Sequence, residues 1–176
     1  AYFQTGRPEQ GWGLLLGATL EGAYASSVPG GFSHIGAGTD FSDNCHTFAR
    51  TVVEGLFGFV PDYPNNRVTI RPGFPASWPK ATIKTPDYSL DFRQEEDVDR
   101  YRITLTRPAD VECLIPLRAE GIVRVTVNGL EGKWDVSAGF GSSLLRLRVP
   151  QASVADLAIQ LSRRTSSGPP VHVEAK

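Results

Sequence analysis

Residues 42–58 read SDNCHTFARTVVEGLFG and form the clearest amphipathic pattern in the chain. Ser42 or Asp43 suits the N-cap of a helix, and Gly58 suits its C-terminal end. The stretch therefore predicts a helix with one buried face, standing between glycine-rich helical sequence and strand-like sequence. The apolar residues that recur at the three- and four-residue spacing of that face are Cys45, Phe48, Ala49, Val52, Val53, Leu56 and Phe57.

The opposite side of this helix carries His46, Arg50 and Glu54 at successive four-residue steps, so their side chains line up. Two interpretations stay open. The row is a solvated, salt-bridged surface, or its N-terminal end, with Asp43, Asn44 and His46, faces a pocket.

The preceding segment, residues 8–25, also has helical periodicity, with Pro8 suited to the first turn. Glycines at 11, 13, 17 and 22 interrupt it, and each interior glycine costs about 1 kcal/mol relative to alanine. We expect this helix to need close neighbours, which glycine permits, within a larger helical assembly. Residues 26–41 predict a loop containing His34 and Asp40.

Beyond Gly58 the sequence turns to strands, because prolines at 61, 64, 72, 75 and 79 argue against a helix. Asn128-Gly129 signals a tight hairpin. Alternating apolar and polar residues at this strand spacing predict an antiparallel β-sandwich, so the fold class is mainly β, preceded by two helices. The predicted strands are 67–71, 81–85, 88–94, 100–107, 110–117, 121–127, 132–136, 144–149 and 155–162.

The chain thus divides into helices over residues 1–60, a proline-rich connector with a first strand over 61–80, the sandwich over 81–164, and a tail over 165–176. In the connector, Trp78 is the expected anchor against the sandwich.

Composition narrows the function classes. The 176 residues carry a net charge of −1 without a basic block, so neither nucleic acid nor a membrane surface is an expected partner. The chain contains no methionine, which indicates a mature form, a processed product or a fragment. Its two cysteines, Cys45 and Cys113, lie in apolar patterns and are expected to be buried thiols.

No motif for a nucleophile, a phosphate loop or a metal is present, so no cofactor and no metal is expected. Paired carboxylates remain, since glycosidic hydrolysis uses an acid and a base about 5–10 Å apart. The carboxylates in and beside the helices are Glu9, Glu21, Asp40, Asp43 and Glu54. A structural role is the simpler interpretation of each.

The order of features over residues 36–79 resembles the end of an α-L-rhamnosidase-like six-hairpin glycosidase. In that family, the last helix of a catalytic (α/α)6 barrel leads into a C-terminal β-sandwich. The family opens this helix with Ser-x-Asn-His, whereas Cys45 here separates Asn44 from His46. The matching residues are Ser42, Asn44, His46, Gly55, Leu56, Gly58, Pro61, Asp62, Ile70, Pro72, Pro75 and Trp78.

The resemblance implies the C-terminal fragment of a glycoside hydrolase, inactive alone, acting on plant or microbial polysaccharide in the periplasm or outside a bacterial cell. It implies that Asn44, His46, Asp43 and His34 bind sugar. The family's Trp-Glu base segment has no match, which leaves Asp40 and Glu21 as weak candidates for the catalytic base. The remainder of the barrel, or a second copy of the chain, would cover the apolar helix face.

Two alternatives stay open. The sandwich carries a sugar site of its own, with Trp134, Tyr88 or Phe140 as a stacking platform, or it is purely structural.

Overall fold

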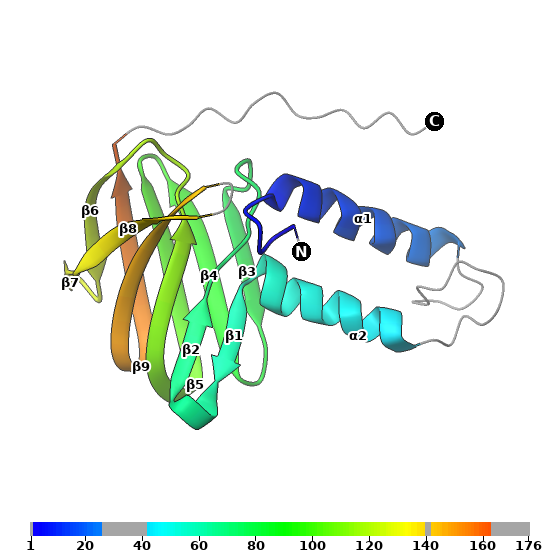
Figure 1. The fold of residues 1–176 in the computed structure, drawn as a ribbon, viewed down its shortest axis with the longest axis horizontal. Coiled ribbons are helices and arrows are strands. Elements are labelled where there is room, and N and C mark those ends of the chain that lie inside the picture. The colour runs from blue at the N-terminus through cyan, green and yellow to red at the C-terminus, as the bar shows by residue number, and fades with distance from the viewer. Residues whose placement is uncertain (1, 26–41, 140–141, 163–176) are drawn as a thin grey trace.

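The structure is a computed structural model that describes residues 2–25, 42–139 and 142–162, with side chains described for 2–18, 46–139 and 142–162. A two-helix hairpin stands against one side of a two-layered β-structure and extends away from it (Figure 1). The mainly β fold class predicted from the sequence is confirmed.

The two helices occupy the predicted segments. Helix α1 spans Pro8–Ala25, and helix α2 (Ser42–Arg50) continues into a π-helical turn, η1 (Thr51–Leu56). At the end of α2, the Thr51 hydroxyl donates a hydrogen bond to the Thr47 carbonyl at 2.7 Å. A side-chain bond of this kind competes with the backbone hydrogen bonds of an α-helix. The wider turn closes with the Phe57 N–H donating to the Val52 carbonyl, and it buries Leu56 and Phe57.

Gly58 ends this helix in a left-handed conformation, with φ of +71°. Its carbonyl accepts a hydrogen bond from the Arg71 N–H at 2.9 Å. A Cβ at position 58 would lie 2.0 Å from the Arg71 carbonyl group, so both the dihedral angle and the space require glycine here.

Nine strands follow within residues 59–139 and 142–162, with one short 3-10 turn, η2 (Tyr63–Asn65), between the first two. The strands are β1 (Phe59–Asp62), β2 (Arg67–Ile70), β3 (Lys80–Lys84), β4 (Tyr88–Glu95), β5 (Val98–Pro116), β6 (Ile122–Val127), β7 (Leu130–Glu131), β8 (Trp134–Ala138) and β9 (Ser143–Leu161). The Asn128-Gly129 hairpin is confirmed, because Val127 pairs with Leu130 and both turn residues have positive φ.

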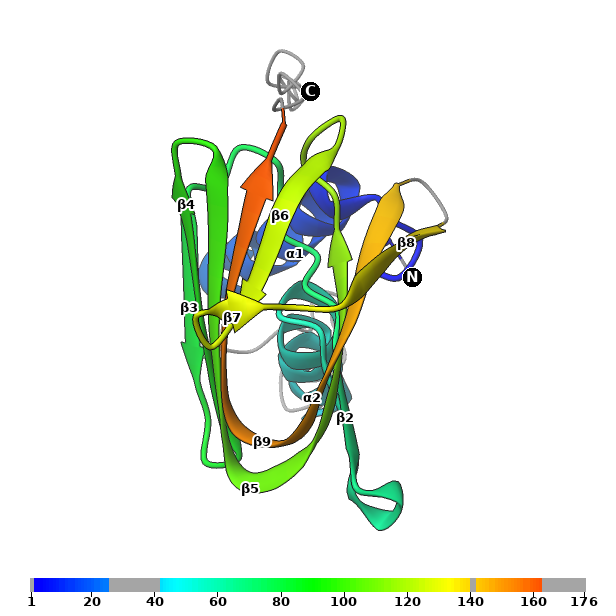
Figure 2. The same cartoon turned by 90° about the vertical axis from the view of Figure 1, so that its left-hand side faces the viewer.

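Strands β5 and β9 bend back on themselves and belong to both layers (Figure 2). Their arms 98–104 and 154–161 form layer A with β3, β4, β6 and β7. Their arms 109–116 and 143–152 form layer B with β1, β2 and β8. The sequence predicted four separate strands here, 100–107, 110–117, 144–149 and 155–162, with Pro108 and Pro150 in the gaps between them. The two prolines mark the bend instead, where the pairing register shifts.

Three further predictions need correction. The sheet is not wholly antiparallel, since β2 runs parallel to β5. Strand β1 was not predicted, because residues 61–80 were assigned to a connector whose first strand begins at residue 67, yet an edge strand tolerates a proline such as Pro61. Proline also failed to exclude all helix, because η2 contains Pro64.

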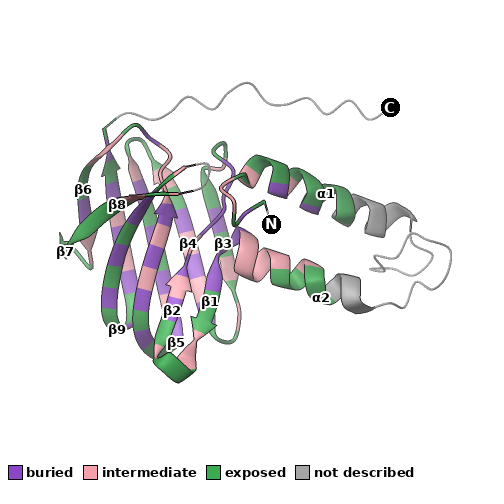
Figure 3. Cartoon of the chain, viewed as in Figure 1, coloured by how far each residue is buried: buried purple, intermediate pink, exposed green. Residues whose placement is uncertain are grey.

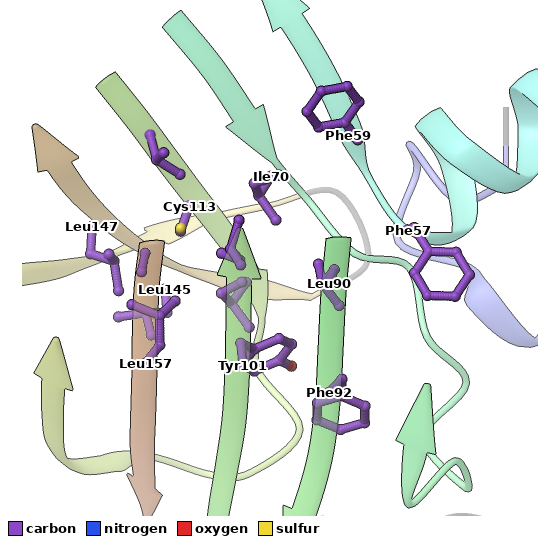
Figure 4. Close-up of a cluster of buried hydrophobic side chains, with 14 of the residues drawn as sticks. Phe57, Phe59, Ile70, Leu90, Phe92, Tyr101, Cys113, Leu145, Leu147 and Leu157 are labelled. Atoms are coloured by element: carbon purple, nitrogen blue, oxygen red, sulfur yellow. The ribbon is translucent and has the colours of Figure 1, made fainter. Parts of the chain in front are cut away.

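Apolar residues that alternate along the strands meet between the layers (Figures 3 and 4). Phe92, Ile70, Leu90 and Leu145 are fully buried there. Cys113 is buried among them as a free thiol, as predicted, while the side chain of Cys45 lies outside the described residues. Burial, and secondarily the charge of Glu112, raises the pKa of Cys113 to about 12.

We expect Gly58→Ala to destabilise the fold by at least about 2 kcal/mol, since the added methyl meets the Arg71 backbone in a left-handed conformation. Gly13→Ala is the matched control, because nothing lies within 4 Å of its added methyl and alanine favours a helix by about 0.5–1 kcal/mol. Urea unfolding followed by tryptophan fluorescence measures both. Equal effects of the two substitutions would contradict the role assigned to Gly58.

We expect the Cys113 thiol to make the fold sensitive to alkali. Its folded pKa lies above the unfolded value of about 8.5, so its contribution to stability is present below that pH and is lost as the pH rises toward 12. In a Cys45→Ser background, the urea midpoint should fall between pH 7.5 and 10.5 by more than it does after Cys113→Ala. An identical pH dependence in both proteins would show that the thiol does not contribute.

Candidate functional site

A continuous set of aromatic rings joins the helical hairpin to the sandwich. Trp12 of α1 meets Trp78 of the connector edge to face, with ring centroids 4.8 Å apart. Trp78 stacks on Phe74 at 6.2 Å, and Phe74 stacks on Phe92 of β4 at 5.2 Å. Phe57, after η1, meets Phe74 at 5.2 Å. Trp78 is thus the predicted anchor, and it also holds α1.

Arg118, in the loop after β5, fixes the connector from the sandwich side. Its Nη2 donates to the carbonyls of Pro75, Ala76 and Trp78, and its guanidinium lies 5.0 Å from the centre of the Phe92 ring. The Pro75 carbonyl also accepts a hydrogen bond from the Trp78 N–H at 3.1 Å. Because the prolines of the connector have no N–H to donate, the Arg118 side chain adds donors to its carbonyls. Sequence reasoning missed Arg118, because nothing in its local sequence sets it apart.

Phe3 wedges between the hairpin and the connector. Its ring lies against three glycines, one from α1, one from η1 and one from the connector. A Cβ added to Gly11, Gly55 or Gly73 would come within 2.9, 2.9 or 2.8 Å of the ring. The predicted close approach at glycine is therefore real for Gly11.

We call these residues the joint: Phe3, Gly11, Trp12, Gly55, Phe57, Gly73, Phe74, Trp78, Phe92 and Arg118. Nothing in the described part of this chain lies within 4 Å of a Cβ added at Gly13 or Gly17, so close neighbours for these two glycines stay a prediction about the larger assembly.

The polar row on α2 and η1 is exposed near its start. His46 is exposed, and Arg50 Nε donates to Glu54 Oε2 at 2.8 Å, which raises the pKa of Arg50. This i,i+4 ion pair matches the solvated, salt-bridged interpretation for the Arg50–Glu54 part of the row.

Three of the residues predicted for the sugar site lie, by backbone position, at the hairpin end remote from the sandwich. The last turns of α1 hold Glu21, and the first turn of α2 holds Asp43 and Asn44; both lie at that end (Figure 1). The side chains of these three residues lie outside the described set, as do His34 and Asp40 altogether. The assignment of all six residues, His46 included, stays a prediction.

Two other carboxylates have structural partners. Glu9 Oε1 accepts a hydrogen bond from the Ala76 N–H at 2.7 Å, which ties the first turn of α1 to the connector. Glu54 pairs with Arg50. Both contacts fit the structural interpretation made from the sequence.

The aromatic residues considered as a stacking platform for sugar differ in how far their side chains are exposed to solvent. Tyr88 is 2% exposed and stacks on Phe59 at 3.9 Å, so its ring faces are covered. Trp134 is 38% exposed, on the edge strand β8, and Phe140 lies outside the described residues.

The described residues contain no cluster of three or more His, Cys, Asp or Glu side chains placed to hold a metal ion. Within the same residues, no helix combines the length and apolar content that a membrane crossing requires.

No protein-family model and no curated protein matches the chain. Among solved structures, it is similar to an alpha-L-rhamnosidase from Dictyoglumus thermophilum, with a TM-score of 0.42 and 16% sequence identity. The match covers 65% of this chain and 13% of the rhamnosidase chain. The chain therefore spans a small part of that enzyme's length, and nothing about activity follows from a likeness of this degree.

We expect Gly55→Ala to destabilise the joint by about 1–3 kcal/mol, because the new methyl overlaps the Phe3 ring. Gly17→Ala, with open space around it, should be neutral or stabilising. Tryptophan fluorescence during urea unfolding reports on Trp12 and Trp78 directly.

A second substitution tests the cause of that destabilisation. Phe3→Leu should cost less in the Gly55→Ala background than in the parent, because the smaller side chain makes room for the methyl. Additive effects would show that the ring and the methyl do not meet.

Proposed function

We propose that this chain is the C-terminal part of a carbohydrate-active enzyme, a glycoside hydrolase whose sandwich supports the last two helices of a helical catalytic domain. One observation carries the proposal: residues of the six-hairpin glycosidase pattern coincide with the joint and its turns. Gly55 contacts Phe3, Gly58 makes the left-handed turn, and Trp78 bridges α1 to Phe74. The resemblance therefore falls on residues that set how the helices leave the sandwich.

In this proposal, the sandwich has a mechanical role. The joint fixes the sandwich-proximal ends of both helices, and the helices carry the candidate sugar-binding residues at their other end (Figure 1). Catalysis depends on holding such groups in place to within a fraction of an ångström. In this proposal, Asp43, Asn44 and His46 contact the sugar, with Glu21 or Asp40 as the candidate base.

The surface of α1 supports a further covering partner. Leu14 and Leu16 are 63% and 40% exposed on a helix whose base alone is held by the joint. The proposed cover is the remainder of the catalytic domain. An isolated chain 1–176 would then be inactive, and the substrate would be a plant or microbial polysaccharide encountered in the periplasm or outside the cell.

A carbohydrate-binding module is the second candidate. It is favoured by Trp134, whose indole is partly exposed on β8, whereas the buried ring of Tyr88 does not serve.

Hydrolysis of an aryl glycoside panel, α-L-rhamnopyranosides included, tests the proposal. We expect no activity from chain 1–176 and activity from the longest polypeptide that its gene encodes. In that polypeptide, His46→Ala should raise KM about tenfold, the cost of one lost hydrogen bond to a charged or polar partner. Arg50→Ala, one turn along the same exposed row, is the control and should leave KM unchanged.

Two outcomes would contradict the proposal. One is hydrolysis by chain 1–176 alone. The other is a gene that encodes this chain directly behind a secretion signal, with no helical segments between them.

A further inference from the structure

The outer face of layer B contains a pocket of about 150 Å³, formed by β2, β5 and the bend of β9. Four charged side chains line it, Arg67, Asp110, Glu112 and Arg148, together with Pro150. These residues come from paired strands, so the sheet itself sets their spacing. The pocket lies on a different part of the fold from the helix end considered above.

Arg67 and Asp110 stand directly opposite each other in the parallel pair of β2 and β5. Opposite charges in such positions ordinarily pair. Among the described residues, however, Arg67 makes no ion pair. Asp110 is turned toward the bend, because its Oδ1 accepts hydrogen bonds from the Gln151 N–H at 2.9 Å and the Gln151 Nε2 at 3.3 Å. No described group bonds Asp110 Oδ2.

Glu112 is held in a similar way, with one oxygen occupied. Its Oε1 accepts bonds from Arg146 Nε at 2.9 Å and Nη2 at 2.6 Å, with Arg148 Nη2 at 3.5 Å. No described residue donates to its Oε2, although the side chain is only 14% exposed. The bond from Arg146 lowers the pKa of Glu112, so the carboxylate is ionised near neutral pH.

Three charge pairs lie on layer A, Arg93–Asp91, Arg100–Glu95 and Arg102–Asp156. On layer B, Glu112 pairs with Arg146 at 2.6 Å and with Arg148 at 3.5 Å. The opposed charges Arg67 and Asp110 differ from these, because Asp110 is bonded to Gln151 and no described residue forms an ion pair with Arg67. The pocket on layer B retains two carboxylate acceptors and two guanidinium donors around one space.

We propose that this pocket binds one pyranose unit of a neutral carbohydrate. Adjacent hydroxyls of a sugar both donate and accept, so they match carboxylate oxygens and guanidinium N–H groups on the same wall. An anion would face two carboxylates, and a cation would face two guanidinium groups. A space of 150 Å³ corresponds to about five water molecules in the liquid, which suits a single ring.

This site is independent of the helix end and would add a second carbohydrate contact to the proposed enzyme. Its small size and polar wall predict weak binding, with Kd of about 1 mM or weaker for a ligand of this size.

Titration of the folded chain 1–176 with methyl α-L-rhamnopyranoside and methyl α-D-glucopyranoside, followed by amide NMR shifts, tests the proposal. We expect saturable shifts at residues 67, 110–112 and 148–151 with at least one of the two sugars. Arg67→Ala should weaken that binding at least fivefold. The exposed Arg124→Ala on layer A is the control and should leave the affinity unchanged.

Three results would overturn the proposal: no shift at these amides up to 50 mM of either sugar, shifts confined to the surroundings of Trp134, or tighter Arg67-dependent binding of sodium glucuronate than of the neutral sugars. The thermal midpoint of Arg67→Ala confirms that the variant is folded. A negative result here leaves the glycosidase proposal untouched, because that proposal is tested by the hydrolysis assay and by the KM of the His46→Ala variant.

Discussion

The contact between Trp12 and Trp78 is the constraint on which the relation of helices to sandwich depends. It closes a series of rings that runs through Phe74 to Phe92 inside layer A. Each such pair contributes about 0.5–1.5 kcal/mol beyond simple burial, so the series is strong enough to fix a direction. The proline-rich connector makes this possible, since it holds Trp78 and Phe74 in place while Arg118 satisfies its carbonyls. A flexible connector would lose the same contacts to chain entropy.

The two long bent strands explain why one small chain carries a helical hairpin on a stable base. Because β5 and β9 cross from layer A to layer B, the layers share backbone as well as core. Residues 98–104 and 109–116 of β5 thus present alternate side chains to one interior, and Tyr101, Val111 and Cys113 are all buried. The joint rests on layer A through Phe92, so the orientation of the hairpin is tied to the whole sandwich.

Local periodicity predicted both helices and the inward faces of most strands, because apolar residues recur at the spacing that places them on one buried face. The prediction failed where the same type of residue occurs in two different local structures. Pro108 and Pro150 fall between segments predicted as separate strands but lie at bends within continuous strands, and Pro61 lies in an edge strand. Gly11 and Gly13 look alike in sequence, yet only Gly11 meets the Phe3 ring, a contact that depends on chain segments far apart.

In the candidate sites too, features set by neighbouring residues could be inferred from the sequence, whereas features set by strand pairing could not. The Arg50–Glu54 pair follows from four-residue spacing and was one of the two interpretations left open by the sequence. The pocket on layer B was not, because it depends on three strands. Arg67, Glu112 and Arg148 come together through a parallel pairing of β2 with β5 and an antiparallel pairing of β5 with β9. Each strand alone shows only an ordinary polar alternation. The strand register places these charges around one space, where Glu112 pairs with Arg146 and Arg148 while Asp110 accepts hydrogen bonds from Gln151.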